Sequence, residues 1–398
     1  MSVASETRYP SLDHAECPYP LFKEFREEGP VVKLEATGEY IVSRHEDVSA
    51  ALRDTETFSS DVGTAGPRVN DHGYQSMLLS DPPDHTAKRR LAFEPFKPVR
   101  LREQTPMVER VVDDVIAAFS DSGTGDFMQE FALPIPIKVT ANLMGLPPED
   151  YDQIASWCDL EASGNVYLPP EERVKQQAKD RQMVEYVREA IRARVETPTE
   201  DMLGKMVTLQ IERDGEYNET MMMAEGANLL LGGIVTTAHL ISSALLILLS
   251  SPEEMAKTRA DYKRIPTLLE EALRVESPVQ WRPRRTTVDT KIGDVEIPAE
   301  SRVLLLLGAA NRDERCFHAP EEFDASRKNV KRHMAFGLGT HFCLGAPLAR
   351  LEGKIAFEKL LTSLSEIKLT TCPEHIKHIP SVLFRSPAEL PVAFTRAS

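Results

Sequence analysis

The chain of 398 residues has few cysteines and fewer basic than acidic residues. Its five cysteines are odd in number and form no Cys-x-x-Cys pair, which argues against a disulfide framework, a structural zinc site and a thiol redox motif. The formal net charge of -15 argues against a general nucleic-acid binder, because neutralising phosphates requires surplus Lys and Arg. The composition is that of a folded, enzyme-sized protein in a reduced, cytosolic setting.

No targeting segment is evident at the start of the chain. The first residues are polar and proline-rich, without a basic stretch followed by an apolar one, so we expect no signal peptide and a loosely ordered segment over residues 1–17. Residues 227–249 are apolar enough to raise the question of a membrane span, but they carry a Gly-Gly pair and polar residues such as Thr236 and His239. Such groups are costly in lipid, so we expect a buried central helix and a cytoplasmic protein without membrane contact.

Most of the chain has helical periodicity. Alternation and a Gly-containing turn predict a hairpin over residues 31–42, and residues 291–307 predict a second small sheet. Helices are predicted over residues 107–119, 149–161, 170–196, 221–250, 265–276 and 347–364. We find no repeat and no interdomain linker, which favours one mainly α domain with a minor β portion over residues 1–398. No Gly-x-Gly-x-x-Gly follows a strand, so a built-in nicotinamide or flavin module is not expected.

A single cysteine, Cys343, lies in the glycine-rich run FGLGTHFCLG of residues 336–345. A thiolate is a strong donor to iron, and the glycines leave room for a flat macrocycle to approach. A helix beginning near Pro347 would place its positive end beside the anion. A buried free cysteine beside a turn is the alternative explanation of this loop taken alone.

A second pattern lies upstream of this loop, where Glu271 and Arg274 are three positions apart on one helical face and can pair. The order of the two patterns, together with the glycine-rich run, resembles the cytochrome P450 haem-thiolate monooxygenases, most closely the soluble bacterial branch. Phe336, Gly339 and Gly345 occupy fixed positions of the family's haem-binding signature. The resemblance extends from about residue 18 to the carboxyl terminus.

The resemblance implies the single-domain P450 fold, a haem b cofactor and O2 as a reactant. It implies a monooxygenase that inserts one oxygen atom into a small, largely apolar substrate, with electrons from NAD(P)H through a separate reductase and ferredoxin. Two alternatives stay open: a peroxygenase driven by hydrogen peroxide, and a non-enzymatic haem-binding sensor. The substrate, the position oxidised and the oligomeric state are not predicted.

By resemblance, Cys343 is the axial iron ligand, whose electron donation favours O–O cleavage. The same resemblance gives the cations that hold the haem propionates as His85, Arg89, Arg284 and His341. For Arg282 three partners stay open: a propionate, an acidic group of the substrate, or water. A solvated surface charge is the alternative for each of these side chains.

By resemblance, the central helix carries the family's oxygen-activation segment, and Thr236 matches the threonine that hydrogen-bonds the iron-bound oxygen species. Paired glycines weaken a helix, and the Thr236 hydroxyl can bond the freed backbone and open a kink. The alternative is a helix–helix contact through small residues. The family usually has an acid before this threonine, whereas this chain has Val235, so we expect water and Thr236 to relay the protons that O–O cleavage requires.

Further contacts are implied by the family alone. Substrate contacts are expected at Leu229, Gly232, Gly233, Val279 and Phe384. Glu322 occupies a position where the family commonly has Arg or His to complete the Glu-Arg cluster. A basic patch for an acidic ferredoxin is expected from Lys88, Arg89, Arg90, Lys97, Arg100, Arg327, Lys328, Lys331 and Arg332.

Overall fold

The computed structural model describes residues 8–62, 75–158 and 170–397. Within these ranges the chain is mainly helical with small sheets, so the predicted fold class is confirmed. The chain divides into two compact units. The first comprises residues 1–62, 239–343 and 367–393, and the second comprises residues 63–238, 344–366 and 394–398. The expected single domain stays a prediction.

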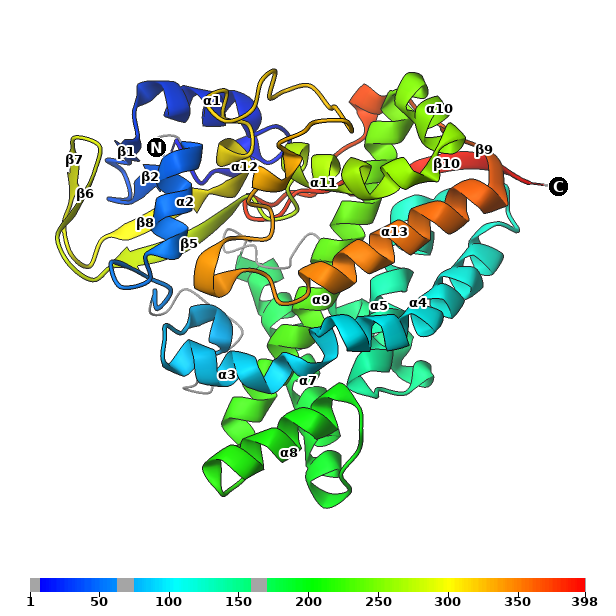
Figure 1. Ribbon diagram of the computed structural model, residues 1–398, viewed down its shortest axis with the longest axis horizontal. Coiled ribbons are helices and arrows are strands. Elements are labelled where there is room, and N and C mark those ends of the chain that lie inside the picture. The colour runs from blue at the N-terminus through cyan, green and yellow to red at the C-terminus, as the bar shows by residue number, and fades with distance from the viewer. Residues whose placement is uncertain (1–7, 63–74, 159–169, 398) are drawn as a thin grey trace. The chain divides into compact units, whose positions relative to one another are not determined.

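A five-stranded sheet with the order β1-β2-β8-β5-β3 forms part of the first unit (Figure 1). Its strands are β1 Val31–Lys33, β2 Tyr40–Val42, β3 Phe58–Ser59, β5 Trp281–Thr286 and β8 Arg302–Leu306. The predicted hairpin is confirmed by the antiparallel pairing of β1 with β2. The predicted second sheet is wrong in part, because β8 pairs in parallel with β2, and only β6 Thr290–Ile292 and β7 Val295–Ile297 form a sheet of their own.

Strand β8 is apolar after its first residue because both of its faces are buried. Leu304 and Leu306 pack in one hydrophobic cluster with Trp281, whereas Val303 and Leu305 pack in another. Successive side chains point to opposite faces of a strand, so a continuous apolar run is required where both faces are covered.

The first unit also contains short helices and the amino-terminal segment. Its helices are α1 Tyr19–Glu28, α2 His45–Arg53, α10 Pro252–Ala260, α11 Ile265–Val275 and α12 Leu307–Ala310. Residues 8–17, expected to be loose, instead contain a 3-10 helix over Leu12–His14 and a buried Tyr9 whose ring packs edge-on against Phe22 and Phe25. Burial of that aromatic ring orders a segment whose polar composition predicted the opposite. Residues 1–7 lie outside the described ranges.

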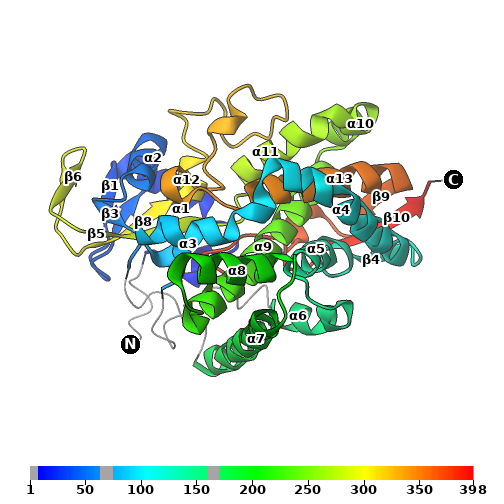
Figure 2. The same cartoon turned by 60° about the horizontal axis from the view of Figure 1, so that its bottom comes forward.

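The second unit is mainly helical, and α4 and α13 lie side by side in both views (Figures 1 and 2). Its helices are α3 Asp84–Ala92, α4 Pro98–Phe119, α5 Pro134–Met144, α6 Tyr151–Trp157, α7 Pro170–Glu196, α8 Met202–Asp214 and α13 Ala346–Ser363. A three-stranded sheet has the order β4-β10-β9, from β4 Thr124–Asp126, β10 Pro391–Arg396 and β9 Leu364–Leu369. Strands β9 and β10 each include residues of both units.

Helix α9, Glu219–Ser250, extends through both units. By length and composition it could cross a membrane, but 67% of its most apolar window is buried inside the protein. This burial favours the predicted core helix. Helix α4 begins at Pro98, well before the predicted residue 107, and Pro106 lies inside it.

Candidate functional site

The Cys343 loop is a tight turn closed by its own backbone. The N–H of Cys343 donates to the Phe336 carbonyl at 2.8 Å, and the N–H of Gly337 donates to the Met334 carbonyl at 2.9 Å. Gly339 has a φ of 66° and approaches α2 so closely that a Cβ atom there would lie 3.1 Å from the Leu52 carbonyl oxygen. Both the left-handed backbone and the close approach require glycine at this position.

The sulfur of this loop is accessible to a ligand. Cys343 is exposed, and the ring of Phe342 beside it is 37% exposed. A Cβ atom at Gly345 would meet nothing within 4 Å, so space is open two residues after the cysteine. Helix α13 begins directly afterwards at Ala346 with Pro347 in its first turn, which places the positive end of a helix close in sequence to the thiolate.

Two of the predicted propionate ligands lie in the same unit as Cys343. Arg284 is buried on β5 and donates to the Pro283 carbonyl at 2.8 Å. The Nε2 atom of His341 lies 3.0 Å from the Ser60 hydroxyl, which fixes the orientation of the imidazole within the loop. His341 lies two residues before Cys343, so a protonated imidazole there could bind a carboxylate of a macrocycle held by the sulfur.

The other two predicted propionate ligands, His85 and Arg89, lie on α3 in the second unit. His85 is only 2% exposed. Burial lowers the pKa of its imidazole, and the positive charge of Arg89 lowers it further. The two residues lie one helical turn apart on α3, so their side chains share one face of the helix.

The two glycines of α9 have different surroundings. A Cβ atom at Gly233 would lie 2.9 Å from the Thr140 hydroxyl oxygen on α5, whereas one at Gly232 would meet nothing within 4 Å. Close helix packing therefore explains Gly233, and open space lies beside Gly232. The Thr236 hydroxyl donates to the Gly232 carbonyl at 3.1 Å as predicted, although α9 continues through this segment without a break.

The partly exposed positions of α9 in the second unit form a stripe. Leu229, Gly232, Gly233 and Thr236 all retain solvent access, whereas Val235 is 3% exposed. The stripe follows the helical period, so these side chains share one face of α9. The position that commonly carries an acid faces the core instead.

In the first unit, the structure brings together two segments predicted to contact substrate. Val279 and Phe384 form an isolated antiparallel bridge, and the N–H of Gln280 donates to the Leu383 carbonyl at 2.8 Å. Val279 is buried, whereas Phe384 keeps partial access to solvent. Residues over a hundred positions apart in sequence are therefore neighbours on one apolar wall.

Two buried ionisable groups on α9 were given no role from the sequence. Glu225 is 1% exposed and accepts a hydrogen bond from the Met77 N–H at 2.8 Å, and burial raises the pKa of its carboxyl to about 7. His239 is fully buried, and its ring lies edge-on to Phe384 at a centroid distance of 5.9 Å. Burial lowers the pKa of His239 to about 3. Their only signal in the sequence is polarity within an apolar run.

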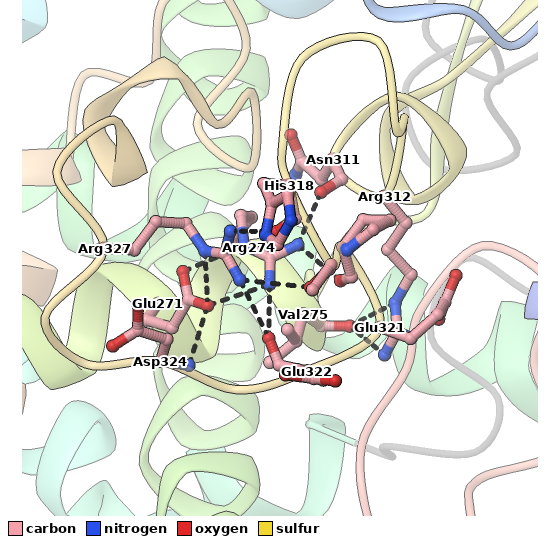
Figure 3. A network of polar contacts seen from close by, with 12 residues as sticks. Glu271, Arg274, Val275, Asn311, Arg312, His318, Glu321, Glu322, Asp324 and Arg327 are labelled. Carbon is pink, nitrogen blue, oxygen red and sulfur yellow. Dashed lines mark hydrogen bonds and ion pairs between the residues drawn. The ribbon is translucent and has the colours of Figure 1, made fainter.

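Glu271 and Arg274 form a fully buried pair, with both side chains 0% exposed (Figure 3). The Arg274 Nε and Nη2 atoms each donate to a Glu271 carboxylate oxygen at 2.8 Å. Glu322 does not pair through its carboxylate, because only its backbone carbonyl accepts from Arg274, at 3.0 Å. The second cation on Glu271 is Arg327, whose Nε lies 2.9 Å from the carboxylate.

The predicted basic patch is therefore wrong at two positions. The Arg327 side chain is only 7% exposed and forms an ion pair with Glu271. Lys88 is 3% exposed and pairs with Asp84 at 2.5 Å. The patch residues that are exposed are Arg90, Lys328, Lys331 and Arg332.

The chemistry of this site fits a haem held by a thiolate. An accessible cysteine in a glycine-rich loop, open space beside Gly345, and Arg284 and His341 in the same unit suit a flat dianionic macrocycle. Within residues 8–62, 75–158 and 170–397, no group of three or more His, Cys, Asp or Glu side chains could hold a metal ion without such a cofactor.

Comparison with known proteins agrees with this chemistry. The family model described as Cytochrome P450 matches residues 170–389. Cytochrome P450 107B1 of Saccharopolyspora erythraea is 34% identical and is matched over 89% of this chain and 88% of its own. The 6-deoxyerythronolide B hydroxylase of the same organism is 30% identical, over 94% of this chain and 95% of its own.

Solved structures agree as well. The cytochrome P450 CYP109Q5 from Chondromyces apiculatus has a TM-score of 0.86 at 32% identity, with 100% of this chain and 99% of that chain covered. Members of the family bind haem b through a cysteine thiolate and act on small molecules with O2 and redox partners. This chain belongs to the cytochrome P450 family and is an oxidoreductase, a P450 monooxygenase.

Proposed function

We propose that the protein inserts one oxygen atom of O2 into a small, largely apolar organic substrate and that Cys343 is the axial ligand of its haem. The observation that carries the proposal is the accessible Cys343 sulfur in a loop closed by the Phe336–Cys343 hydrogen bond. The bound haem supplies the activation of O2, and the thiolate favours cleavage of the O–O bond.

Four side chains would bind the haem carboxylates. Arg284 and His341 belong to the unit that carries Cys343, and His85 and Arg89 share one face of α3. Arginine presents two parallel N–H groups to a carboxylate, which orients the macrocycle as well as binding it. Burial lowers the pKa of the His85 imidazole, and the negative charge of a bound carboxylate beside it would raise that pKa again.

The substrate contacts would come from apolar, partly accessible positions. They are Leu229, Gly232, Gly233 and Thr236 on α9 in one unit, and the bridged pair of Val279 and Phe384 in the other. Among the relatives are a 6-deoxyerythronolide B hydroxylase and a vitamin D(3) 25-hydroxylase. These names differ in substrate, so the resemblance supports an apolar organic molecule as a class.

Proton delivery would depend on Thr236 and water. Val235 is buried and has no proton to give, so the hydroxyl of Thr236 is the protic side chain of the accessible α9 stripe. Its hydrogen bond to the Gly232 carbonyl holds the hydroxyl beside the open space at Gly232. A hydroxyl in that position can pass a proton from water toward the reacting oxygen.

Electrons would come from NAD(P)H through a reductase and a ferredoxin, in the cytoplasm. Arg90 in one unit and Lys328, Lys331 and Arg332 in the other are exposed cations on a protein whose net charge is -15. Local positive charge steers an acidic partner even where the whole protein is acidic.

Absorption spectroscopy tests the ligand. The reduced carbonyl adduct of the wild-type protein should show the strongly red-shifted band of thiolate ligation, and Cys343→Ser should lose it. A wild-type protein without that band would overturn the proposal. Screening a compound library for the spin-state change caused by displacement of iron-bound water then identifies substrates.

Coupling of NADH consumption to product tests the proton relay in wild type, Thr236→Ala and Val235→Asp. Thr236→Ala should uncouple NADH consumption from product formation. Val235→Asp keeps the Thr236 hydroxyl and should stay coupled. Unchanged coupling in Thr236→Ala would contradict a relay through this hydroxyl. Turnover with hydrogen peroxide but not with ferredoxin would identify the peroxygenase instead.

A further inference from the structure

Arg282 lies on β5 beside a predicted cofactor ligand. Its Cα pairs with that of Leu305, and the Cα of Arg284 pairs with that of Val303. Side chains two residues apart on a strand share a face, so Arg282 and Arg284 project from the same side of β5, and Arg285 projects from the other.

Several buried arginines of the unit that carries Arg282 bind carboxylates. Arg274 binds Glu271, Arg312 binds Glu276, and Arg385 binds Glu276 at 2.6 Å. By contrast, the guanidinium of Arg282 makes no hydrogen bond or ion pair with any residue that the structure describes. Leaving a partly buried guanidinium without hydrogen-bond acceptors is unfavourable.

The face of β5 that carries Arg282 lies toward the start of the cysteine loop. Arg282 and Arg284 pair across the sheet with Leu305 and Val303, so all four side chains share that face. Leu305 and Val303 pack in one hydrophobic cluster with Met334, and Leu338 of the cysteine loop packs against the same cluster. A guanidinium on this face has five N–H donors to satisfy.

We propose that Arg282 binds a carboxylate beside Cys343, in the unit that also carries Arg284 and His341. A carboxylate accepts two parallel N–H bonds from one guanidinium and carries the opposite charge. Two sources have this chemistry: a propionate of the haem, and a carboxylate of the substrate. The inference rests on the proposed function, because both sources require haem at Cys343.

The variants Arg282→Gln and Arg282→Lys test this inference, with Arg285→Gln as the matched control. Arg285 is on the same strand but faces away and pairs with Glu300 at 2.5 Å and the Asp61 carbonyl at 2.8 Å. Two quantities are measured on the haem-loaded proteins: the rate of haem transfer to excess apomyoglobin, and the affinities for decanoic acid and for decanol from spectral titration.

If the carboxylate is a propionate, Arg282→Gln should lose haem about tenfold faster than wild type or more, since a charge-assisted pair is removed, with Arg282→Lys in between. If it belongs to the substrate, haem transfer should stay unchanged while decanoic acid binding weakens about tenfold and decanol binding does not. If Arg282→Gln matches Arg285→Gln in both measurements, the inference is wrong. A wild-type protein without the thiolate band would instead overturn the proposed function.

Discussion

The charge of Arg327 has two interpretations, as a docking cation or as a buried ion-pair partner, and one substitution distinguishes them. The sequence places it in a basic segment that suggests a ferredoxin-docking cation, whereas the structure places it against Glu271 with a side chain only 7% exposed. Replacing it by Gln keeps a polar side chain and removes the charge. The buried interpretation predicts a loss of folding stability, and the docking interpretation predicts weaker binding of ferredoxin with stability unchanged.

The contacts of Arg327 set the expected magnitude. Its guanidinium donates to the Glu271 carboxylate at 2.9 Å, to the His318 carbonyl at 2.5 Å, to the Ala319 carbonyl at 3.2 Å and to the Glu322 carbonyl at 3.0 Å. Removing one partner of a buried ion pair typically costs about 3–5 kcal/mol. Since Glu271 keeps Arg274, we expect the lower end, a free energy of unfolding reduced by about 3 kcal/mol.

Urea unfolding followed by far-UV circular dichroism measures this loss. Lys328→Gln is the matched control, because Lys328 is the exposed neighbour and should change the free energy of unfolding by no more than about 0.5 kcal/mol. In a Glu271→Gln background, Arg327→Gln should cost less, because the ion pair is already broken. Equal stability of the Arg327→Gln and Lys328→Gln proteins, with ferredoxin affinity lowered only in the former, would refute the buried interpretation.

Three further predictions concern α9. Burial raises the pKa of Glu225 to about 7 from an ordinary 4.5, so the stabilising contribution of this carboxyl is complete below pH 4.5 and is lost as pH rises through 7. Glu225→Gln should remove about 3 kcal/mol of this pH dependence, measured as urea midpoints at pH 5 and pH 8. An unchanged pH dependence would exclude Glu225 as its source. Burial lowers the pKa of His239 to about 3 from 6.5, so the contribution of the neutral imidazole to stability is complete above pH 6.5 and is lost as pH falls toward 3. In an acid titration, His239→Phe should therefore unfold at a lower pH than wild type. An identical midpoint would contradict this. A Cβ atom at position 233 would lie 2.9 Å from the Thr140 hydroxyl oxygen, whereas one at position 232 would meet nothing within 4 Å. In urea unfolding, Gly232→Ala should therefore be more stable than Gly233→Ala by about 1 kcal/mol. The reverse order would contradict close packing of Gly233 against Thr140.

Much of the fold followed from local pattern. The limits of α7, the pairing of β1 with β2 and the helix after the cysteine loop are set by periodicity, turn glycines and a first-turn proline, which act within a few residues. The addition of β8 to the hairpin was not predictable in this way. Parallel pairing joins segments more than two hundred residues apart, and no local preference specifies it.

The candidate site divides along the same line. The glycine-rich run and its single cysteine are contiguous, so the chain alone was enough to indicate a thiolate site and the family. Burial, by contrast, depends on what packs around a side chain. It makes Arg327 a partner of Glu271, leaves Glu322 outside that pair and shifts the pKa of Glu225 and His239.

Sequence by itself therefore determined the cysteine loop, the mainly helical class and the kind of cofactor, because each depends on residue types at fixed short spacings. Only the tertiary structure decided which charges are buried, which glycine of α9 packs against α5, and that Arg282 makes no hydrogen bond or ion pair with a described residue. The physical reason is that desolvation and pairing are set by neighbours brought in from distant parts of the chain.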